Sequence, residues 1–222
     1  MGTPIKHYKL DFFEQDSEEL YYFLGFIASD GYITDERIEI YLNIKDEAII
    51  KKFVELICPD ATIKYDGKTN SCGFTIYNKV LAAKYKKFFS MTTNKKAFEL
   101  RFPLIPINYI KDFIRGYIDG DGCIDTTKSY RNNKAYVGPR LRILGNYEFL
   151  KTLNEVTKVF VHHNTNAIAK KGKENVYYVA YNFSTAERLL EWLYKDSKIS
   201  LERKYNKAIN LIGYRETINN VA

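Results

Sequence analysis

Two apolar runs of this sequence, about ninety residues apart, have the same order of large, small and acidic residues. Residues 22–31 are YFLGFIASDG and residues 113–122 are FIRGYIDGDG. Each run has a glycine among large apolar residues and Asp-Gly at its end, and the two runs start 91 positions apart (113 − 22). Their hydrophobic pattern predicts helices. The chain therefore contains a duplicated helical motif.

The glycine in the middle of each run predicts close packing between the two helices. A glycine inside a helix costs about 1 kcal/mol relative to alanine, so it usually has a packing reason. Because Gly25 and Gly116 lack a Cβ, they would let the helices approach each other. Gly31 and Gly122 follow at the helix ends, where we expect a positive φ.

The acidic residue near the end of each run is in an unfavourable place for a carboxylate. The C-terminal end of a helix carries partial negative charge and favours Lys or Arg. Asp30 and Asp121 would also repel each other, and at least one would resist ionisation. A divalent cation removes this conflict, and Mg²⁺ is the commonest candidate. The alternative, two ordinary helices ending in Asp-Gly turns, is disfavoured by the equal spacing of the two copies.

Asp119 lies two residues before Asp121 and needs a separate interpretation. At 100° per residue the two side chains are about 200° apart around the helix, so they point to opposite sides. The residue at the same place in the first run is Ala28. We therefore interpret Asp119 as structural or peripheral.

The rest of the hydrophobic pattern runs in the same order in both halves: helix, hairpin, helix, hairpin, helix. In the first half we expect helices at 16–30, 46–57 and 79–89, and hairpins of 32–33 with 37–42 and of 62–65 with 74–77. In the second half, after the second motif, we expect a hairpin of 123–124 with 136–144 around a polar loop at 126–135, a hairpin of 167–171 with 176–183, and helices at 148–160, 185–194 and 198–212. Asp16 and Glu19 fit a capping box at the start of the first helix. We expect residues 213–222 to be loosely held.

The two motifs resemble those of the LAGLIDADG homing endonucleases, in the form that carries both copies on one chain. The flanking segments 10–13, 16–20 and 102–106 also fit this family. Ala28 stands where the family has its sixth-position Asp, and Ser29 and Gly120 stand at the small seventh position. Neither departure affects the eighth-position acids, Asp30 and Asp121.

This resemblance implies an α+β fold of two pseudo-symmetric αββαββα halves, residues 1–103 and 104–222, in one compact unit. The motif helices would form the interface, and two antiparallel sheets would form a saddle over double-stranded DNA. Asp30 and Asp121 match the family's catalytic metal-binding acids, with Mg²⁺ or Mn²⁺ as the cofactor. The family cuts both strands across the minor groove and leaves short 3′ overhangs.

The same resemblance implies a basic residue near each scissile phosphate, where it would stabilise charge or position water. Lys96 and Lys204 match that pattern best. The alternative is that both are exposed lysines without a catalytic role.

The net charge of +7 is unevenly distributed. Residues 1–103 contain 15 basic and 15 acidic residues, whereas residues 104–222 contain 19 and 12, so the second half has the whole surplus. No acid occurs between Thr126 and Tyr147. A basic surface of this kind suits phosphate binding, although it is often only a solvated face. The candidate DNA-binding residues are Lys128, Arg131, Lys134, Arg140, Arg142, Lys170 and Lys171.

Composition excludes several other classes of protein. Apolar residues make up 45% of the chain, no apolar run reaches 18 residues, and the N-terminus lacks a signal-peptide core, so we expect an intracellular, non-secreted monomer without a membrane partner. The three cysteines fit neither a zinc-ligand spacing nor an even disulfide framework. Because the two halves fill the chain and no splicing segments flank them, we do not expect an intein origin.

Three functions of different classes fit this sequence. The first is a site-specific, metal-dependent double-strand DNA endonuclease, the second an RNA-binding intron maturase, and the third a DNA-binding regulator that no longer cleaves. Retention of both Asp30 and Asp121 argues against the third, since an inactive site need not keep a repelling pair. We expect the endonuclease.

Overall fold

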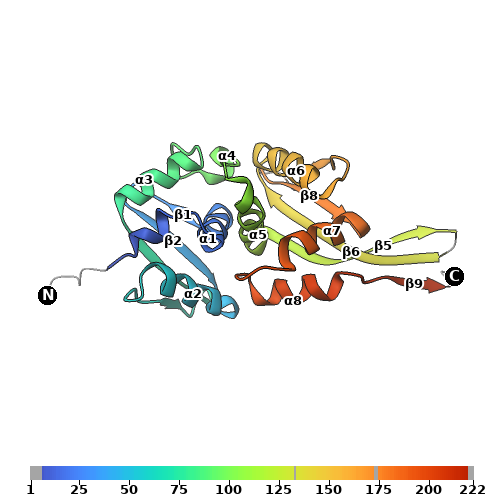
Figure 1. Cartoon of the computed structure of the whole chain (residues 1–222), viewed down its shortest axis with the longest axis horizontal. Coiled ribbons are helices and arrows are strands. Elements are labelled where there is room, and N and C mark those ends of the chain that lie inside the picture. Colours follow the sequence, from blue (N-terminus) through green and yellow to red (C-terminus); the bar gives the residue numbers. More distant parts are fainter. Residues whose placement is uncertain (1–6, 133, 173–174, 220–222) are drawn as a thin grey trace.

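The computed structural model describes residues 7–132, 134–172 and 175–219, and it consists of two similar halves set side by side (Figure 1). The first half contains α1 (Glu18–Ser29), β1 (Tyr32–Ile33), β2 (Arg37–Asn43), α2 (Glu47–Ile57), β3 (Lys64–Asp66), β4 (Ser71–Tyr77) and α3 (Lys79–Phe88). The second contains α5 (Ile110–Asp121), β5 (Gly122–Arg131), β6 (Lys134–Gly145), α6 (Tyr147–Val161), β7 (Ile168–Lys170), β8 (Tyr177–Asn182) and α7 (Phe183–Tyr194). The expected αββαββα order is therefore present in both halves.

Shorter elements complete the fold. The 3₁₀ helices η1 (Leu10–Phe13), η2 (Ile44–Asp46) and η3 (Ile107–Tyr109) precede α1, α2 and α5. After the last main helix of each half comes α4 (Lys96–Glu99) or α8 (Glu202–Leu211), and β9 (Glu216–Asn219) follows α8. These two helices place a lysine at each motif helix.

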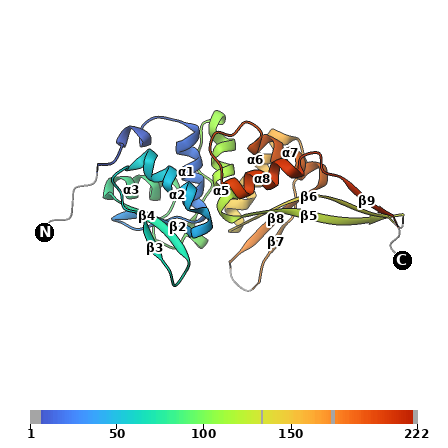
Figure 2. The ribbon, with the colours of Figure 1, turned by 90° about the horizontal axis from the view of Figure 1, so that it is seen from below.

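Each half has an antiparallel sheet with the same strand order, β1-β2-β4-β3 in the first and β5-β6-β8-β7 in the second. Alternate residues of the central strands, such as Ile38 and Ile40 in β2 and Leu141 and Ile143 in β6, are buried. Figure 2 shows the helices on one side of both sheets. Because successive side chains of a strand point to opposite faces, the residues between the buried ones lie on the other face, which we call the open face.

The buried apolar side chains of both halves form one continuous cluster. Phe53 and Phe74 belong to its first half, Phe149 and Leu190 to its second, and all four are almost inaccessible to solvent. Within the described ranges no helix combines the length and the apolar character that crossing a membrane requires.

The strands β5 and β6 are longer than the sequence predicted. Residues 126–135 were expected to be a loop, but β5 and β6 pair continuously from Gly122↔Ile143 to Arg131↔Lys134. β9 adds to the same ribbon by pairing with β6, so residues 216–219 are a strand and not a loose end, while 220–222 lie outside the described residues. We call 126–132, 134–137 and β9 the arm. It extends beyond the helices (Figure 1). Ala135 and Val137 of the arm are buried, but residues 126–131 are mostly exposed, so that stretch lacks the alternation of a half-buried strand.

The capping residue of α1 also differs from the prediction. Ser17, not Asp16, is the N-cap, and its Oγ accepts a hydrogen bond from the Leu20 backbone N–H at 3.1 Å. Asp16 instead accepts the Tyr21 hydroxyl at 2.8 Å. Both residue types are good caps, so the sequence offered two neighbouring candidates.

Candidate active site

The two motif helices, α1 and α5, pack directly against each other at their glycines. A Cβ on Gly25 would lie 2.0 Å from the carbonyl oxygen of Phe113, and one on Gly116 would lie 2.0 Å from that of Tyr22. No side-chain rotation relieves these overlaps, because the obstacles are backbone atoms. The contact is reciprocal, since each glycine faces the residue three positions before the other glycine. The helices therefore cross with approximate two-fold symmetry.

Gly31 and Gly122 are needed for a different reason from the one predicted. Within the described ranges, the glycines with positive φ are Gly172 and Gly213, and Gly122 has a φ of −90° and a ψ of 153°. A Cβ on Gly31 would lie 2.6 Å from the Ile27 carbonyl oxygen, and one on Gly122 would be equally crowded at the end of α5. The prediction of a left-handed turn was wrong; the chain bends back closely over the last helical turn.

The helix crossing places Asp30 and Asp121 beside each other at the junction of the two halves. Asp30 caps the C-terminus of α1, and Asp121 is the last residue of α5. The Asp30 carboxylate lies against the opposite helix, because a Cβ on Gly120 would be 2.1 Å from its Oδ2. Ser29 donates its hydroxyl to the same oxygen at 3.2 Å. Each half thus contributes one carboxylate.

Both carboxyl groups of this pair resist ionisation. Burial, together with the negative charge of Asp30, raises the pKa of Asp121 to about 6, although Lys96 and Lys204 oppose the shift. Asp30 keeps contact with solvent, yet desolvation by the surrounding protein raises its pKa too, against the charge of Lys96. A divalent cation would relieve this repulsion.

Lys204 of α8 holds the C-terminal end of α5. Its buried ammonium donates hydrogen bonds to the carbonyl oxygens of Ile118 at 2.7 Å, Asp119 at 2.6 Å and Gly120 at 3.1 Å. The Ile118 carbonyl also accepts the Gly122 backbone N–H, whereas those of Asp119 and Gly120 are among the carbonyls that a helix end leaves without a helical partner, and a cation there is favourable. An ammonium has three hydrogens, so all of them are engaged. Burial lowers the pKa of Lys204 to about 8.

Lys96 of α4 holds the end of α1 in the corresponding way. Its ammonium donates to the carbonyl oxygens of Ser29 and Gly31, the latter at 2.9 Å. Burial lowers its pKa, while the charges of Asp121 and Asp30 act in the opposite direction. Both predicted lysines therefore lie beside the acids, and this arrangement explains how the chain places carboxylates at helix C-termini. A catalytic role for the lysines stays a prediction.

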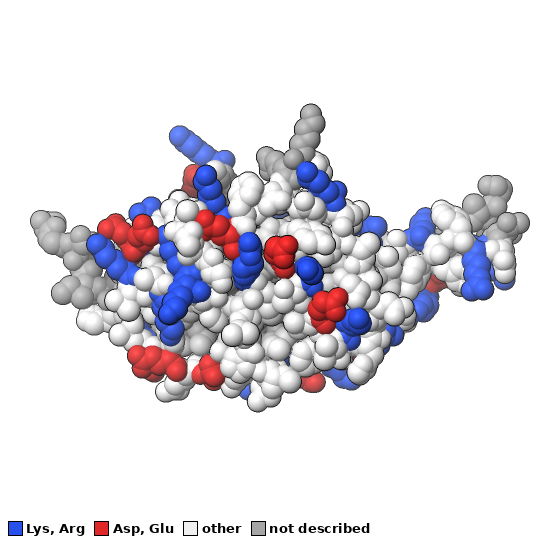
Figure 3. Space-filling model, turned by 90° about the horizontal axis from the view of Figure 1, so that it is seen from above, with Lys and Arg blue, Asp and Glu red and all other residues white. Residues whose placement is uncertain are grey.

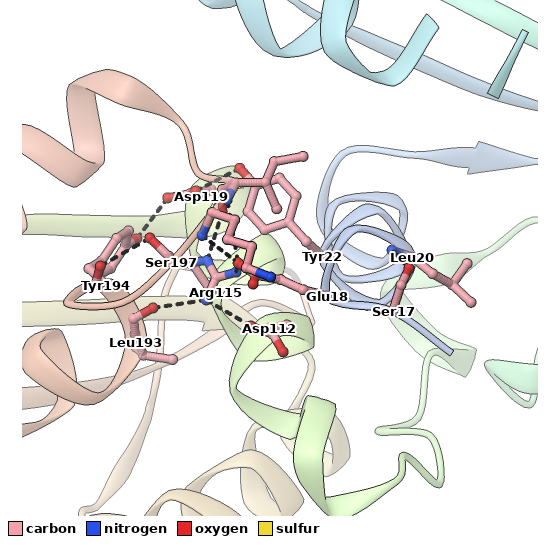
Figure 4. Close-up of polar contacts among 12 residues, drawn as sticks. Ser17, Glu18, Leu20, Tyr22, Asp112, Arg115, Asp119, Leu193, Tyr194 and Ser197 are labelled. Carbon is pink, nitrogen blue, oxygen red and sulfur yellow. Dashed lines mark hydrogen bonds and ion pairs between the residues drawn. The ribbon is translucent and has the colours of Figure 1, made fainter. Parts of the chain in front are cut away.

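Asp119 belongs to a buried network with Tyr22 and Tyr194 and not to the acidic pair (Figure 4). It is 1% exposed and accepts three hydrogen bonds, each of 2.7 Å, from the Tyr22 hydroxyl, the Tyr194 hydroxyl and the Leu201 backbone N–H. It therefore joins both motif helices to α7 and to the segment before α8.

Sequence reasoning missed the buried Arg115, which lies beside Asp119 in Figure 4. Its guanidinium is inaccessible to solvent and donates to the carbonyl oxygens of Ile199 and Leu193, both at 2.9 Å, and to Glu18 at 2.7 Å. The signal was an arginine inside an apolar motif whose other copy has Leu24 at that place.

The strand register divides the predicted DNA-binding residues of the arm. Arg131 and Lys134 pair with each other and lie on the open face, whereas Lys128 pairs with the buried Val137 and lies on the opposite face. Lys and Arg side chains gather on this arm (Figure 3).

Arg140 and Arg142 lie on the open face nearer to the motif helices, and both contact an acid. Asp125 comes just before the acid-free run and pairs in register with Arg140. Its carboxylate binds Arg140 at 2.8 and 2.9 Å and Arg142 at 2.8 Å. These two arginines are therefore less available to phosphates than their charges suggest.

The remaining two candidates lie in and beside β7. Alternation along β7 places Lys170 on the same face of the sheet as Ile168. Ile168 pairs with the buried Val179, so this is the helix-covered face and not the open face. Lys171 lines a cavity of about 600 Å³ next to Asp121, together with Lys96.

The donor set suits a small, hard cation that keeps other ligands. Within the described part of the chain, no group of three or more His, Cys, Asp or Glu side chains could hold a metal. Asp30 and Asp121 supply two carboxylates instead. Mg²⁺ commonly binds through one or two carboxylates and keeps waters or substrate phosphates as its other ligands. The two acids therefore fit Mg²⁺ as a ligand pair.

Comparison of the sequence with models of known protein families gave no match. The chain is 27% identical over 128 residues to a probable translation initiation factor IF-2 of Thermococcus kodakarensis, covering 54% of this chain and 11% of that protein. It is 26% identical over 186 residues to the DNA-directed RNA polymerase subunit Rpo1C of Methanocaldococcus jannaschii, covering 79% of this chain and 21% of that one. Because the chain spans so little of these two proteins, their activities are not assigned to it.

Solved structures similar to this one include LAGLIDADG proteins bound to DNA. The meganuclease I-AabMI with uncleaved DNA has a TM-score of 0.57 at 17% identity, covering 87% of this chain and 88% of its own. I-SmaMI with uncleaved DNA and calcium has 0.61 at 13%, covering 90% of each chain. The homing endonuclease I-LtrWI with target DNA has 0.59 at 12%, covering 86% and 88%. The resemblance predicted from the motifs is confirmed at the level of the fold.

Proposed function

From the LAGLIDADG homing endonuclease fold, we propose that this chain is a site-specific double-strand DNA endonuclease. It uses a divalent metal ion, Mg²⁺ or Mn²⁺, and leaves short 3′ overhangs. The proposal rests on the meeting of Asp30 and Asp121, one from each half, at the crossing of two equivalent helices. The two backbones of a duplex are related by two-fold symmetry. A pair of acids related by the same symmetry is therefore suited to cutting both strands. Because one chain supplies both acids, a monomer is sufficient.

Asp30 and Asp121 would hold the metal. A cation bound there supplies charge stabilisation at the scissile phosphate and lowers the pKa of a bound water. Lys96 has one ammonium hydrogen beyond its two carbonyl bonds and can donate it to a phosphate oxygen. Lys204 donates all three of its hydrogens to the end of α5, so it acts through its charge and by fixing that end.

The duplex would lie along the open faces of the two sheets, away from the helices. The arm extends this surface on one side, with Arg131 and Lys134 placed to contact phosphates. The three similar proteins named above have been solved with DNA, which supports this choice of partner.

Cleavage of a randomised duplex library with Mg²⁺, followed by sequencing of the ends, tests the proposal. We expect one long enriched sequence, cut on both strands with short 3′ overhangs. Asp30→Asn and Asp121→Asn should each abolish cutting of that duplex while binding persists, because only the metal-binding charge is removed. Ca²⁺ in place of Mg²⁺ should permit binding and slow or stop cutting.

Cleavage by either Asn variant at the wild-type rate would show that the acids are not the catalytic pair. If no duplex is cut and the protein binds intron RNA equally well with and without the two acids, the maturase alternative is favoured instead.

Cys123 allows the docking face to be tested separately. It is exposed and pairs in register with Arg142, so it lies on the open face, whereas Cys58 and Cys72 are buried. We expect the selected duplex, in Ca²⁺, to protect Cys123 from alkylation by iodoacetamide. Unchanged alkylation at saturating duplex would contradict docking on the open face. An unrelated duplex at the same concentration is the control.

A further inference from the structure

An acid on the open face of the second sheet holds an arginine in one orientation. Arg140 donates Nε to Asp125 Oδ1 at 2.8 Å and Nη2 to Oδ2 at 2.9 Å. The side chains are only 29% and 30% exposed. Two parallel hydrogen bonds fix the plane of the guanidinium as well as its position. We call an arginine held in this way, through Nε by a carboxylate on the open face, a braced arginine.

The first sheet has a braced arginine at the equivalent position. Arg37 donates Nε to the carboxylate of Glu39. The strand pair Ile33↔Ile38 of the first sheet corresponds to Ile124↔Leu141 of the second, since Ile33 and Ile124 are each three residues after the motif acid. Arg37 and Arg140 each come directly before the second member of that pair.

The two braces are built from different positions. Glu39 lies on the same strand as its arginine, whereas Asp125 lies on the neighbouring strand. The residue equivalent to Asp125 in the first half is Thr34, and the residue equivalent to Glu39 in the second half is Arg142. The brace is therefore present twice although the acid is not a duplicated residue, which indicates that the orientation of the arginine matters.

A carboxylate beside an arginine is unsuited to phosphate binding, because it repels the phosphate and offsets the arginine charge. It is well suited to base recognition. The brace uses Nε, or Nε and one hydrogen of Nη2, so the outer pair of hydrogens on Nη1 and Nη2 remains outside it. In the major groove, guanine presents O6 and N7 as a matched pair of acceptors for such a fork. A side chain that is already fixed also loses less rotamer freedom on binding.

Arg142 does not meet this requirement, although it touches the same acid. Its Nη2 donates to Asp125 at 2.8 Å and to Cys123 Sγ at 3.5 Å, which uses both hydrogens of that nitrogen. The outer fork is therefore incomplete, and Arg142 supports Asp125 instead.

We infer that Arg37 and Arg140 each recognise one guanine, at equivalent positions on the two sides of the centre of the target, and that Glu39 and Asp125 are their positioning residues. This inference rests on the proposed DNA-binding function. Each arginine is in register with the fourth residue after its motif acid. At about 3.3 Å per residue, this places each arginine about 13 Å along the strand from that acid. The two guanines therefore lie at similar distances from the cutting centre.

Selection of bound duplexes from a randomised library in Ca²⁺, followed by affinity measurements on single-base variants, tests the inference. The wild-type protein should enrich a guanine once in each half-site. Arg140→Lys keeps the charge but loses the fork, so discrimination against the other bases should fall by about 5- to 100-fold at one of the two positions only. Arg37→Lys should have the same effect at the other position.

The acids give a readout that a merely structural role would not produce. Asp125→Asn should weaken guanine discrimination at the Arg140 position while strengthening binding to unrelated duplexes, because it removes a negative charge from the DNA-facing surface. Glu39→Gln should do the same at the Arg37 position. Arg131→Lys is the matched control, since it lies on the same open face without a brace, and it should leave base preferences unchanged. Melting temperatures establish that each variant is folded.

The two possible failures can be told apart. If the wild-type protein enriches no sequence and cuts no duplex in Mg²⁺, the proposed function fails. If it does enrich and cut a sequence, but Arg37→Lys and Arg140→Lys keep the guanine preference or relax the same position, the assignment of the braced arginines is wrong.

Discussion

Individual residues at the helix crossing show which chemistry the sequence could predict. Asp30 and Asp121 were found from duplication and from the physical conflict of a carboxylate at a helix C-terminus, and the structure places them side by side. The buried contacts of Arg115 could not be predicted in that way, because apart from Asp112 on the same helix its partners Glu18, Leu193 and Ile199 are 78 to 97 residues away in the chain. Comparison of the two motif copies identifies residues that both halves contain, but it does not identify the partners of a residue that only one half contains.

The raised pKa of Asp121 predicts that metal binding depends on pH. Since its pKa in the folded protein is about 6, against an ordinary value of 3.8, the folded state binds this proton more tightly than the unfolded state does. The stabilisation of the metal-free protein by this group is present below the ordinary pKa and is lost as the pH rises through about 6. Mg²⁺ competes with the same proton, so the increase in melting temperature on adding Mg²⁺ should shrink as the pH falls below about 6.

Melting temperatures measured from about pH 5 to about pH 8, with and without Mg²⁺, check this expectation. Asp121→Asn should remove the Mg²⁺ effect and, without metal, should melt higher than wild type at neutral pH. Asp11→Asn, an exposed carboxylate outside the site, is the matched control and should behave as wild type. A Mg²⁺ effect that is the same at every pH would exclude Asp121 as the titrating ligand.

At the level of helices and strands, the order of elements was predictable and the arm was not. The helices and half-buried strands bury one face, and this burial imposes a periodic pattern on their sequence. In the arm, residues 126–131 are mostly exposed, so they contain no such pattern and residues 126–135 resembled a loop. The N-cap of α1 was predicted at Asp16 and not at Ser17 for a different reason, since two suitable capping residues are adjacent.

The reciprocal glycine contact predicts that even alanine is harmful in the motif helices. Gly25→Ala and Gly116→Ala each place a Cβ about 2.0 Å from a carbonyl oxygen, so the helix backbones must separate. Overpacking of this kind costs about 1–3 kcal/mol, or roughly 2–4 °C in melting temperature per kcal/mol for a chain of this size. Separation should also weaken Mg²⁺ binding, because the acids come from opposite helices.

Thermal melts of the two variants, compared with Gly67→Ala, check the glycine contact. A Cβ on Gly67 would have no neighbour within 4 Å, so that substitution should change stability by less than about 0.5 kcal/mol. Wild-type melting temperatures for both Gly25→Ala and Gly116→Ala would rule out a close backbone contact.

At the scale of the whole molecule, the positive surplus of the second half can be traced to particular strands. The surplus of the second half includes the exposed lysines and arginines of the arm (Figure 3), where they could contact the proposed duplex away from Asp30 and Asp121. The arginines nearer the centre are partly neutralised by Asp125. Net charge alone could not separate these two groups, because their roles depend on strand register.

Neutralising the arm should therefore change the salt dependence of DNA binding. Arg131→Gln combined with Lys134→Gln should lower the slope of log K against log salt by up to about one unit for each phosphate that the arm no longer neutralises, with little change in base preference. Lys151→Gln combined with Lys158→Gln is the charge-matched control, because both lysines are exposed on α6, on the helix side of the second sheet. Equal slopes for the two double variants would show that the arm does not contact DNA.

The buried network around Arg115 and Asp119 makes the two halves non-interchangeable. It draws Glu18 and Tyr22 from the first half, and the residues at those places in the second half are Tyr109 and Phe113. In a homodimer assembled from two copies of the second half, each arginine would keep Asp112 but lose Glu18, and each aspartate would keep the Tyr194 hydroxyl but lose that of Tyr22, inside the interface. Breaking a buried charge pair in this way costs about 3–5 kcal/mol. The second half therefore depends on the first for part of the bonding of its own buried charges, which is a dependence that the repeated motif does not show.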